Sequence, residues 1–159
     1  MKVKDVMTAD VKGIVLTESL ADAAKYMWEN DCGTLPVTKD DGKVAGMITD
    51  RDVCMATAVR DRNPSLISVE EVMSGKIFAT TADEDVTKAL ATMREHKVRR
   101  LPVLGEDGEL IGIVSMNDIV LQAQPANGKK APINYADVIK TYQAICEHPL
   151  PMTQTATAG

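Results

Sequence analysis

The sequence repeats itself after 66 residues, and this duplication limits the possible fold more than any other feature. Val6-Met7-Thr8 returns as Val72-Met73-Ser74, and Leu35-Pro36-Val37 returns as Leu101-Pro102-Val103, both at that spacing. The register between the copies needs no gap from Val3 to Val53. A fixed period of this kind indicates one supersecondary unit used more than once. We therefore predict two similar units in tandem.

Each copy shows the same order of local patterns. A short apolar strand is expected at residues 13–15 and at 77–79, and a helix with an apolar stripe follows it. Two further strands come next, and an Asp-Gly turn joins them in each copy. A second helix follows each pair of strands. This order predicts an α+β fold, close to the α/β type, made of two β-α-β-β-α units.

We expect the first unit to span residues 1–62 and the second to span 63–124, with a polar joint between them. A unit of about 60 residues has a marginal core by itself, so the two units gain by packing their sheets together. Residues 125–159 lie outside the repeat. There an apolar stripe predicts a helix over 134–147, and we expect 153–159 to be disordered.

Composition narrows the class of protein. Hydrophobic residues make up 45% of the chain and its net charge is −5, which is typical of a soluble acidic protein. No apolar run is long enough for a membrane span and the N-terminus lacks the apolar core of a signal peptide, so we expect a cytoplasmic protein without membrane contact. Aromatic residues make up only 3%, which disfavours nucleic-acid binding by base stacking. The three cysteines form no C-x-x-C pair, so neither a disulfide framework nor a metal site is indicated.

The pattern Gly-x-x-[Thr/Ser]-x-x-Asp occurs once in each copy, after a predicted strand. Its polar residues are Thr49 and Asp52 in the first copy, and Ser115 and Asp118 in the second. A hydroxyl and free backbone N–H groups at the start of a helix can receive a phosphate, and the carboxylate can accept hydrogen bonds from ribose hydroxyls. The alternative is a capping box with a purely local role. Two copies in register favour a binding role.

These motifs in this order resemble the CBS domain, named for cystathionine β-synthase, and two copies in tandem resemble a Bateman module. The resemblance covers about Val3 to Gln124. It implies two units joined through their sheets with pseudo-two-fold symmetry, and two clefts between them. Members of this family bind AMP, ADP, ATP or S-adenosylmethionine in such clefts.

The resemblance also implies roles for single residues. Thr49 and Ser115 would lie near the phosphate, and Asp52 and Asp118 would bind the ribose. The residues that would line the adenine are Gly13, Ile14 and Val15 in the first copy and Ile77, Phe78 and Ala79 in the second.

The two copies differ in their cations. Arg99 and Arg100 precede the second Leu-Pro-Val, whereas Gly33 and Thr34 precede the first. Conversely, the first Gly-x-x-[Thr/Ser]-x-x-Asp motif contains Arg51, and the second contains Asn117 at that position. Guanidinium groups bind phosphate in a bidentate manner. We therefore expect unequal clefts, with Arg51, Arg99 and Arg100 reaching into one of them; the alternative is that Arg99 and Arg100 are ordinary surface charges.

The sequence thus predicts a regulatory module that binds an adenine nucleotide, forms a homodimer and acts on an unidentified partner protein. No catalytic arrangement or P-loop is present, and we expect neither enzymatic activity nor a catalytic cofactor. His96 and His148 are expected to be surface histidines. Two alternatives stay open: a dimer scaffold whose clefts are vestigial or filled by side chains, and a binder of an S-adenosyl compound or, less in keeping with the composition, of single-stranded nucleic acid.

Overall fold

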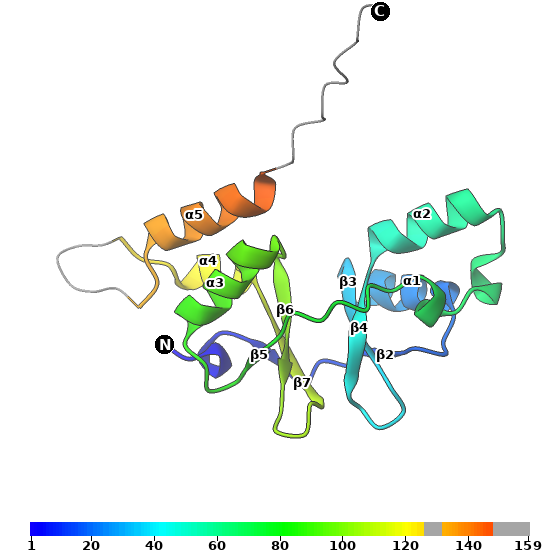
Figure 1. Cartoon of the computed structure of the whole chain (residues 1–159), viewed down its shortest axis with the longest axis horizontal. Helices are drawn as coiled ribbons and strands as arrows, with labels where there is room; N and C mark the ends of the chain where they lie inside the picture. Colours follow the sequence, from blue (N-terminus) through cyan, green and yellow to red (C-terminus); the bar gives the residue numbers. More distant parts are fainter. Residues whose placement is uncertain (126–131, 148–159) are drawn as a thin grey trace, which may run out of the picture.

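The computed structural model describes residues 1–125 and 132–147, and the predicted disorder at 153–159 and His148 lie outside this range. Two halves lie side by side, each with a small sheet facing the other half and helices on its outer side (Figure 1). The α+β class is confirmed. Within the described residues, no helix has both the length and the apolar character needed to cross a membrane.

The first half follows the predicted order of elements. Strand β2 (Ile14–Val15) leads to helix α1 (Leu20–Glu29), then to strands β3 (Thr34–Thr38) and β4 (Val44–Thr49) and helix α2 (Asp50–Arg60). The sheet has the order β2-β3-β4, with β2 parallel and β4 antiparallel to β3. Ser19 caps α1, because its hydroxyl accepts the N–H of Asp22.

The second half repeats these elements with strand β5 (Thr80–Thr81), helix α3 (Val86–His96), strands β6 (Arg100–Leu104) and β7 (Leu110–Ser115), and helix α4 (Met116–Gln122). The strand predicted at 77–79 is wrong, because β5 lies at the position that the 66-residue register assigns to it. Residues 77–79 are more apolar, but Thr80 is the residue that is buried, and its hydroxyl donates to Glu84 Oε2 at 2.6 Å.

Helix α5 (Tyr135–Cys146) has no counterpart in the first half. Its N-cap is Asn134, so the predicted helix over 134–147 is confirmed. Helix α5 packs on α3 and α4 (Figure 1). Ile133 and Val138 are 1% and 5% exposed and belong to the core of the second half.

The segment that precedes each repeat packs against the other half. The short helix η1 (Val3–Asp5) and strand β1 (Thr8–Ala9) lie on the second half, where Thr8 pairs with Ile113 of β7. The helix η3 (Val69–Glu71) lies on the first half, where Ser74 pairs with Met47. These pairs are equivalent under the 66-residue register, so the exchange obeys a pseudo-two-fold axis. The division of the chain at residue 62 stays a prediction about folding units.

This exchange accounts for the glycine of the repeated motif. A Cβ atom at Gly46 would meet the carbonyl oxygen of Ser74, and a Cβ atom at Gly112 would lie 2.7 Å from the carbonyl oxygen of Thr8. Both positions therefore need glycine, because the leading segment of the opposite half crosses the strand there. At both glycines the close approach is made by the backbone of the opposite half.

Two short 3-10 helices complete the chain path, η2 (Pro64–Leu66) between the halves and η3 after it. On the axis itself, Lys43 pairs with Glu109, and the backbone N–H groups of Val44 and Leu110 donate to the carbonyl groups of the opposite Asp-Gly turn. The two sheets are therefore joined by main-chain hydrogen bonds, which fixes how the halves face each other.

Candidate functional site

Both copies of the repeated motif form the same hydrogen-bonded box. Thr49 Oγ1 donates to Asp52 Oδ2 at 2.7 Å and accepts the N–H of Asp52, and Ser115 Oγ donates to Asp118 Oδ2 at 2.6 Å and accepts the N–H of Asp118. The capping role is thus present in each half. Only one oxygen of each carboxylate is used, and the other accepts no hydrogen bond within residues 1–125 and 132–147.

A small polar cavity of about 130 Å³ lies in the second half, where the start of β6, the start of α4 and helix α5 meet. Four of the residues predicted from the sequence line it: Arg99, Arg100, Ser115 and Asn117. Met116 and Tyr142 complete the lining. The two guanidinium groups and the amide provide N–H donors suited to an anion such as a phosphate, whereas the Ser115 hydroxyl already donates its hydrogen to Asp118.

Two residues of this cavity were not predicted as site residues: Met116, which lies inside the repeated motif, and Tyr142. The only signal for Tyr142 in the sequence is membership of the apolar stripe of the C-terminal helix, which says nothing about where that helix packs. Because α5 lies against α3 and α4, its Tyr142 reaches the cavity that the repeat itself forms.

Arg100 lies on the pseudo-two-fold axis. Its guanidinium Nη1 donates to Thr34 Oγ1 at 3.3 Å, and these two residues are equivalent under the 66-residue register. A half-buried arginine therefore crosses from one half to the other, where the opposite copy offers only a hydroxyl. The halves meet here with unequal charge.

The first half lacks the two arginines that line the cavity of the second half. Gly33 replaces Arg99 and Thr34 replaces Arg100, and Arg51 is exposed and is not part of the lining around Arg99. The convergence of Arg51 on the same cleft stays a prediction.

The predicted adenine-lining residues lie in differing environments. Ile14 is 3% exposed and belongs to the core of the first half, while Val15 is half-buried. A Cβ atom at Gly13 would lie 2.8 Å from the carbonyl oxygen of Pro36, so this position faces the neighbouring strand. Ile77 is exposed, Ala79 is half-buried, and Phe78 stacks on His96 with ring centroids 3.8 Å apart.

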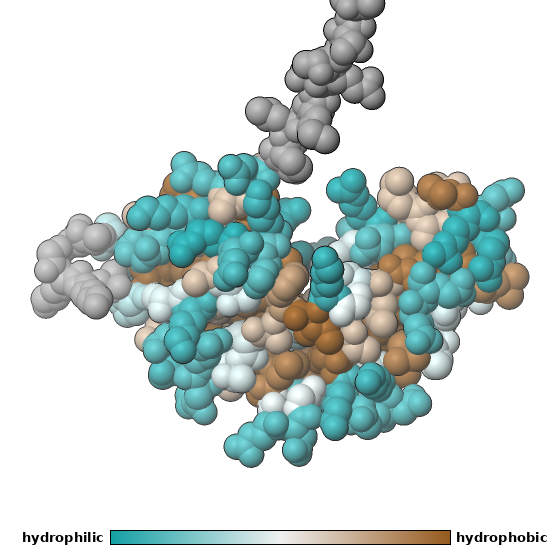
Figure 2. All heavy atoms as spheres, in the orientation of Figure 1, coloured by the Kyte–Doolittle hydropathy of each residue, from teal (hydrophilic) through white to brown (hydrophobic). Residues whose placement is uncertain are grey.

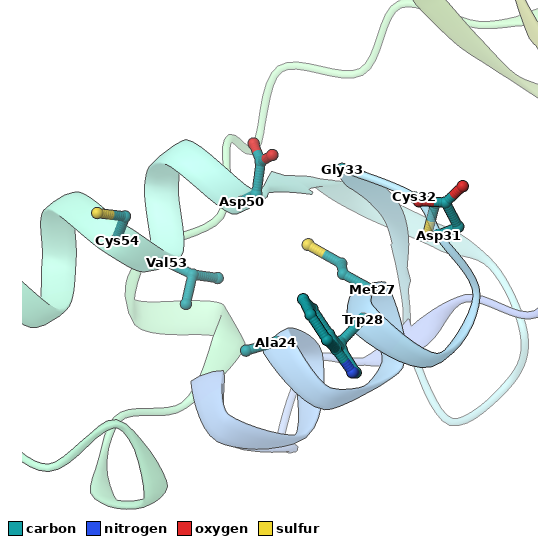
Figure 3. Close-up of a pocket in the computed structure, with 9 residues that line it drawn as sticks. All are labelled: Ala24, Met27, Trp28, Asp31, Cys32, Gly33, Asp50, Val53 and Cys54. Atoms are coloured by element: carbon teal, nitrogen blue, oxygen red, sulfur yellow. The ribbon is translucent and has the colours of Figure 1, made fainter.

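A larger cavity, of about 450 Å³, lies between α1 and α2 (Figure 3). Its lining comes from α1, from residues 31–33 and from α2, and contains none of the residues that the sequence predicts to bind a ligand. We therefore separate this groove from the candidate ligand site, although it is the more spacious of the two.

Comparison with known families matches the CBS domain twice, at residues 3–58 and 69–123. The match ends before α5. Among curated proteins, Hypoxic response protein 1 of Mycobacterium tuberculosis is 37% identical over 116 residues, which cover 73% of this chain and 80% of that protein.

Solved structures agree with this assignment. The crystal structure of Hypoxic Response Protein I with two coordinated zinc ions has a TM-score of 0.68 and 36% identity, and the match covers 76% of this chain and 98% of that one. The CBS domain pair of protein MJ0100, in complex with 5′-methylthioadenosine and S-adenosyl-L-methionine, has a TM-score of 0.66 and 26% identity over 76% and 98% of the two chains. CBSX2 in complex with AMP has a TM-score of 0.65 and 25% identity over 76% and 93%.

Proposed function

Since this chain belongs to the CBS-domain family, we propose that it is a regulatory module that binds an adenine nucleotide and transmits the presence of that ligand to a partner protein. The observation that carries the proposal is the cavity lined by Arg99, Arg100, Ser115 and Asn117, in which the N–H groups of the two arginines and of Asn117 suit a phosphate group. Two similar CBS structures were solved with ligands that contain adenosine, which supports a ligand of this class.

The size of the cavity limits which part of the ligand it holds. Pockets that enclose a whole small molecule measure about 300–1,000 Å³, whereas this cavity measures about 130 Å³. It therefore suits the phosphate group, and the nucleoside would lie outside it, within reach of the unused oxygen of Asp118. A phosphate-bearing ligand is favoured over S-adenosylmethionine, because a sulfonium cation gains nothing from two arginines.

Isothermal titration calorimetry with AMP, ADP, ATP and S-adenosylmethionine tests the proposal. We expect a nucleotide to bind more tightly than S-adenosylmethionine. In Asp118→Asn we expect at least about tenfold weaker binding, since a hydrogen bond to a charged group is worth about 1.5–3 kcal/mol. Asp52→Asn is the matched control, because it disrupts the same capping box in the half that lacks the two arginines.

Binding of none of these ligands below millimolar concentration would contradict the proposal and leave the scaffold alternative. Equal effects of Asp52→Asn and Asp118→Asn would place the ligand in both clefts, or make both effects structural. Thermal unfolding of the two variants without ligand separates these outcomes, because a structural effect lowers the melting temperature directly.

We also propose that the protein is a cytoplasmic homodimer without catalytic activity of its own. Sedimentation velocity over a range of concentrations tests the dimer. A sharp monomer boundary at every concentration would contradict it.

A further inference from the structure

Helix α5 adds a wall to the candidate phosphate cavity from outside the repeated units. The match to the CBS domain ends at residue 123, whereas Tyr142, which lines the cavity together with Arg99 and Arg100, belongs to α5. The repeat supplies every other residue of the lining. The cavity is therefore built from one CBS unit and a single side chain that this unit does not contain.

Contacts at both ends hold α5 in place. At its start, Asn134 pairs with the chain just beyond the end of α4, and at its end Lys97 Nζ lies 3.1 Å from Glu147 Oε2. Helix α5 therefore runs back along α4, and its second half lies beside the residues at which α4 begins (Figure 1). Thr141, directly before Tyr142, is fully buried. These contacts fix the position of Tyr142 at the cavity.

The hydroxyl of Tyr142 is available to a ligand. The side chains of α5 that form hydrogen bonds are those of Asp137 and Thr141, with the N-cap Asn134, and the Tyr142 hydroxyl forms none within residues 1–125 and 132–147. A tyrosine hydroxyl carries one O–H donor. Tyr142 thus adds an O–H donor to the N–H donors of the two arginines and the amide around the same cavity.

The volume of the cavity suits a single phosphate group. The cavity measures about 130 Å³, and a water molecule in the liquid takes about 30 Å³, so there is room for about four atoms of the size of oxygen. The oxygen atoms of one phosphate group fill this room. A chain of two or three phosphates does not fit unless the wall formed by Tyr142 moves.

The residues around the cavity determine which phosphate of a nucleotide enters it. Asp118 directly follows the lining residue Asn117, and its unused carboxylate oxygen is within reach of a ribose. Arg100 lines the cavity and bonds to Thr34 of the other half, so the cavity adjoins the junction of the halves, where Figure 2 shows a notch on the side of α2 and α5. A nucleoside in this notch, with its ribose at Asp118, places the phosphate attached to the ribose in the cavity. Further phosphates then meet Tyr142.

We propose that Tyr142 is a specificity-determining residue of the ligand site: its hydroxyl donates to the phosphate attached to the ribose, and its ring excludes a second phosphate. The site then selects a nucleoside monophosphate over the di- and triphosphate. This inference rests on the proposed function, because it needs the phosphate in the cavity beside Arg99 and Arg100. It adds that α5, and not the CBS unit, sets the length of the phosphate chain.

Replacement of the ring tests the exclusion. Isothermal titration calorimetry without divalent cations measures the affinities for AMP and ATP of the parent chain and of Tyr142→Leu. For the parent chain we expect AMP to bind at least about tenfold more tightly than ATP, since overfilling a packed site is costly. In Tyr142→Leu we expect this ratio to fall below about threefold, because leucine keeps an apolar contact with the core but is shorter than tyrosine.

Tyr135→Leu is the matched control for this ratio. Tyr135 is a tyrosine of the same helix that is 54% exposed and does not line the cavity. The control variant should keep the ratio of the parent chain. Since both affinities are measured on the same folded molecules, a loss of stability in either variant does not change the ratio.

Tyr142→Phe tests the hydroxyl alone, because phenylalanine keeps the ring. We expect AMP to bind about tenfold more weakly, since a hydrogen bond to a charged group is lost. Adenosine, which has no phosphate, should bind with the affinity that it has for the parent chain. Tyr135→Phe should change neither affinity.

The outcomes separate this inference from the proposed function. Binding of neither AMP nor ATP by the parent chain would overturn both. Equal affinities of the parent chain for AMP and ATP, or the same ratio in Tyr142→Leu as in the parent chain, would overturn the role of Tyr142 and leave the nucleotide site in place. A loss of adenosine affinity in Tyr142→Phe as large as the loss of AMP affinity would show that Tyr142 supports the shape of the site and does not contact the phosphate.

Discussion

Helix α2 buries none of its residues, whereas α4, its equivalent in the second half, buries Met116 and Ile119. The two helices start with the same capping box and follow equivalent strands. They differ in two ways: α5 packs on α4, and the positions of Met116 and Ile119 are taken by Asp50 and Val53 in α2. The repeated sequence therefore sets the path of the backbone in both halves, and the residues outside the repeat decide which helical face is open to solvent.

The main-chain contacts between the halves, in contrast, are equivalent in both directions. The backbone N–H groups of Val3 and Lys4 donate to carbonyl groups of the second half, and the equivalent N–H groups of Val69 and Glu70 donate to the first half. Main-chain contacts keep the two-fold relation, while the side chains near the axis, Arg100 against Thr34, break it. A duplicated fold can therefore differ between its halves in side chains near the axis while its main-chain contacts stay the same.

The largest expected effect concerns the covered face. Ile119→Ala should lower the free energy of unfolding by about 2–5 kcal/mol, because it leaves a cavity under α5. Val53→Ala, at the equivalent position in the groove between α1 and α2, should lower the free energy of unfolding by about 1 kcal/mol. Urea unfolding of both variants measures the difference. Equal losses would mean that the groove of the first half is covered in solution.

The next effect concerns the axis. Arg99→Gly with Arg100→Thr gives the second half the residues of the first, and should weaken nucleotide binding about ten- to a hundredfold, since two charge-assisted contacts are lost. The same variant should change the free energy of unfolding by less than about 1 kcal/mol, because Arg99 is exposed and the side chain of Arg100 makes one hydrogen bond among the described residues. Calorimetry and urea unfolding check the two parts. Unchanged affinity would show that the cavity is not the phosphate site.

A third pair of variants tests the part of the molecule that is symmetric. Gly46→Ala and Gly112→Ala should each destabilise the protein by about 1–3 kcal/mol, because each new Cβ atom meets the backbone of the opposite leading segment. Gly75→Ala is the control, since a Cβ atom there would have no neighbour within 4 Å in the part of the chain that the structure describes. Thermal unfolding measures all three. A loss in only one half would mean that the exchange of segments is less symmetric than the backbone pairing indicates.

Much of the framework could be predicted from the sequence because it depends on local chemistry. The capping boxes at Thr49 and Ser115 and the register of the repeat each depend on neighbours a few residues away or on an exact internal copy. The strand predicted at 77–79 is wrong because that prediction relied on the hydrophobicity of these residues, whereas the 66-residue register places the strand at Thr80. Because Thr80 is polar, its hydropathy does not identify it as a buried strand residue, although its hydroxyl is buried with a hydrogen-bond partner.

The rest depended on contacts that no sequence pattern expresses. The position of Tyr142 beside Arg99 requires α5 to pack on the second half and not on the first, which is decided by the fit of about three turns of helix to one of two similar grooves. The crossing of the leading segments is equally hidden, because Val6-Met7-Thr8 gives no sign of which half it joins. The sequence therefore did not predict where short elements pack against distant parts of the chain.

The smallest expected effect concerns how the first leading segment is held. Lys4 Nζ lies 2.7 Å from Asp83 Oδ1, whereas the equivalent positions are Glu70 and Thr17, which cannot form an ion pair. The hydrogen bond and charge of Asp83 raise the pKa of Lys4 above 10.5, and those of Lys4 lower the pKa of Asp83 below 3.8. The Lys4–Asp83 ion pair therefore has no equivalent at Glu70 and Thr17.

The lowered pKa of Asp83 means that its contribution to stability is complete above pH 3.8, the value in the unfolded chain, and is lost as the pH falls through the folded value. The raised pKa of Lys4 means that its contribution is complete below pH 10.5 and is lost as the pH rises through the folded value. Asp83→Asn should therefore lower the melting temperature slightly near neutral pH, and the difference from the parent chain should vanish at both extremes. Both side chains are more than half exposed, so salt should reduce the difference further. As a control, Asp40→Asn removes the same charge from the turn at 40–43, where Lys43 pairs with Asp41 and not with Asp40. It should give no such pH-dependent difference. If it gives the same profile as Asp83→Asn, the effect comes from net charge and the two leading segments are held alike.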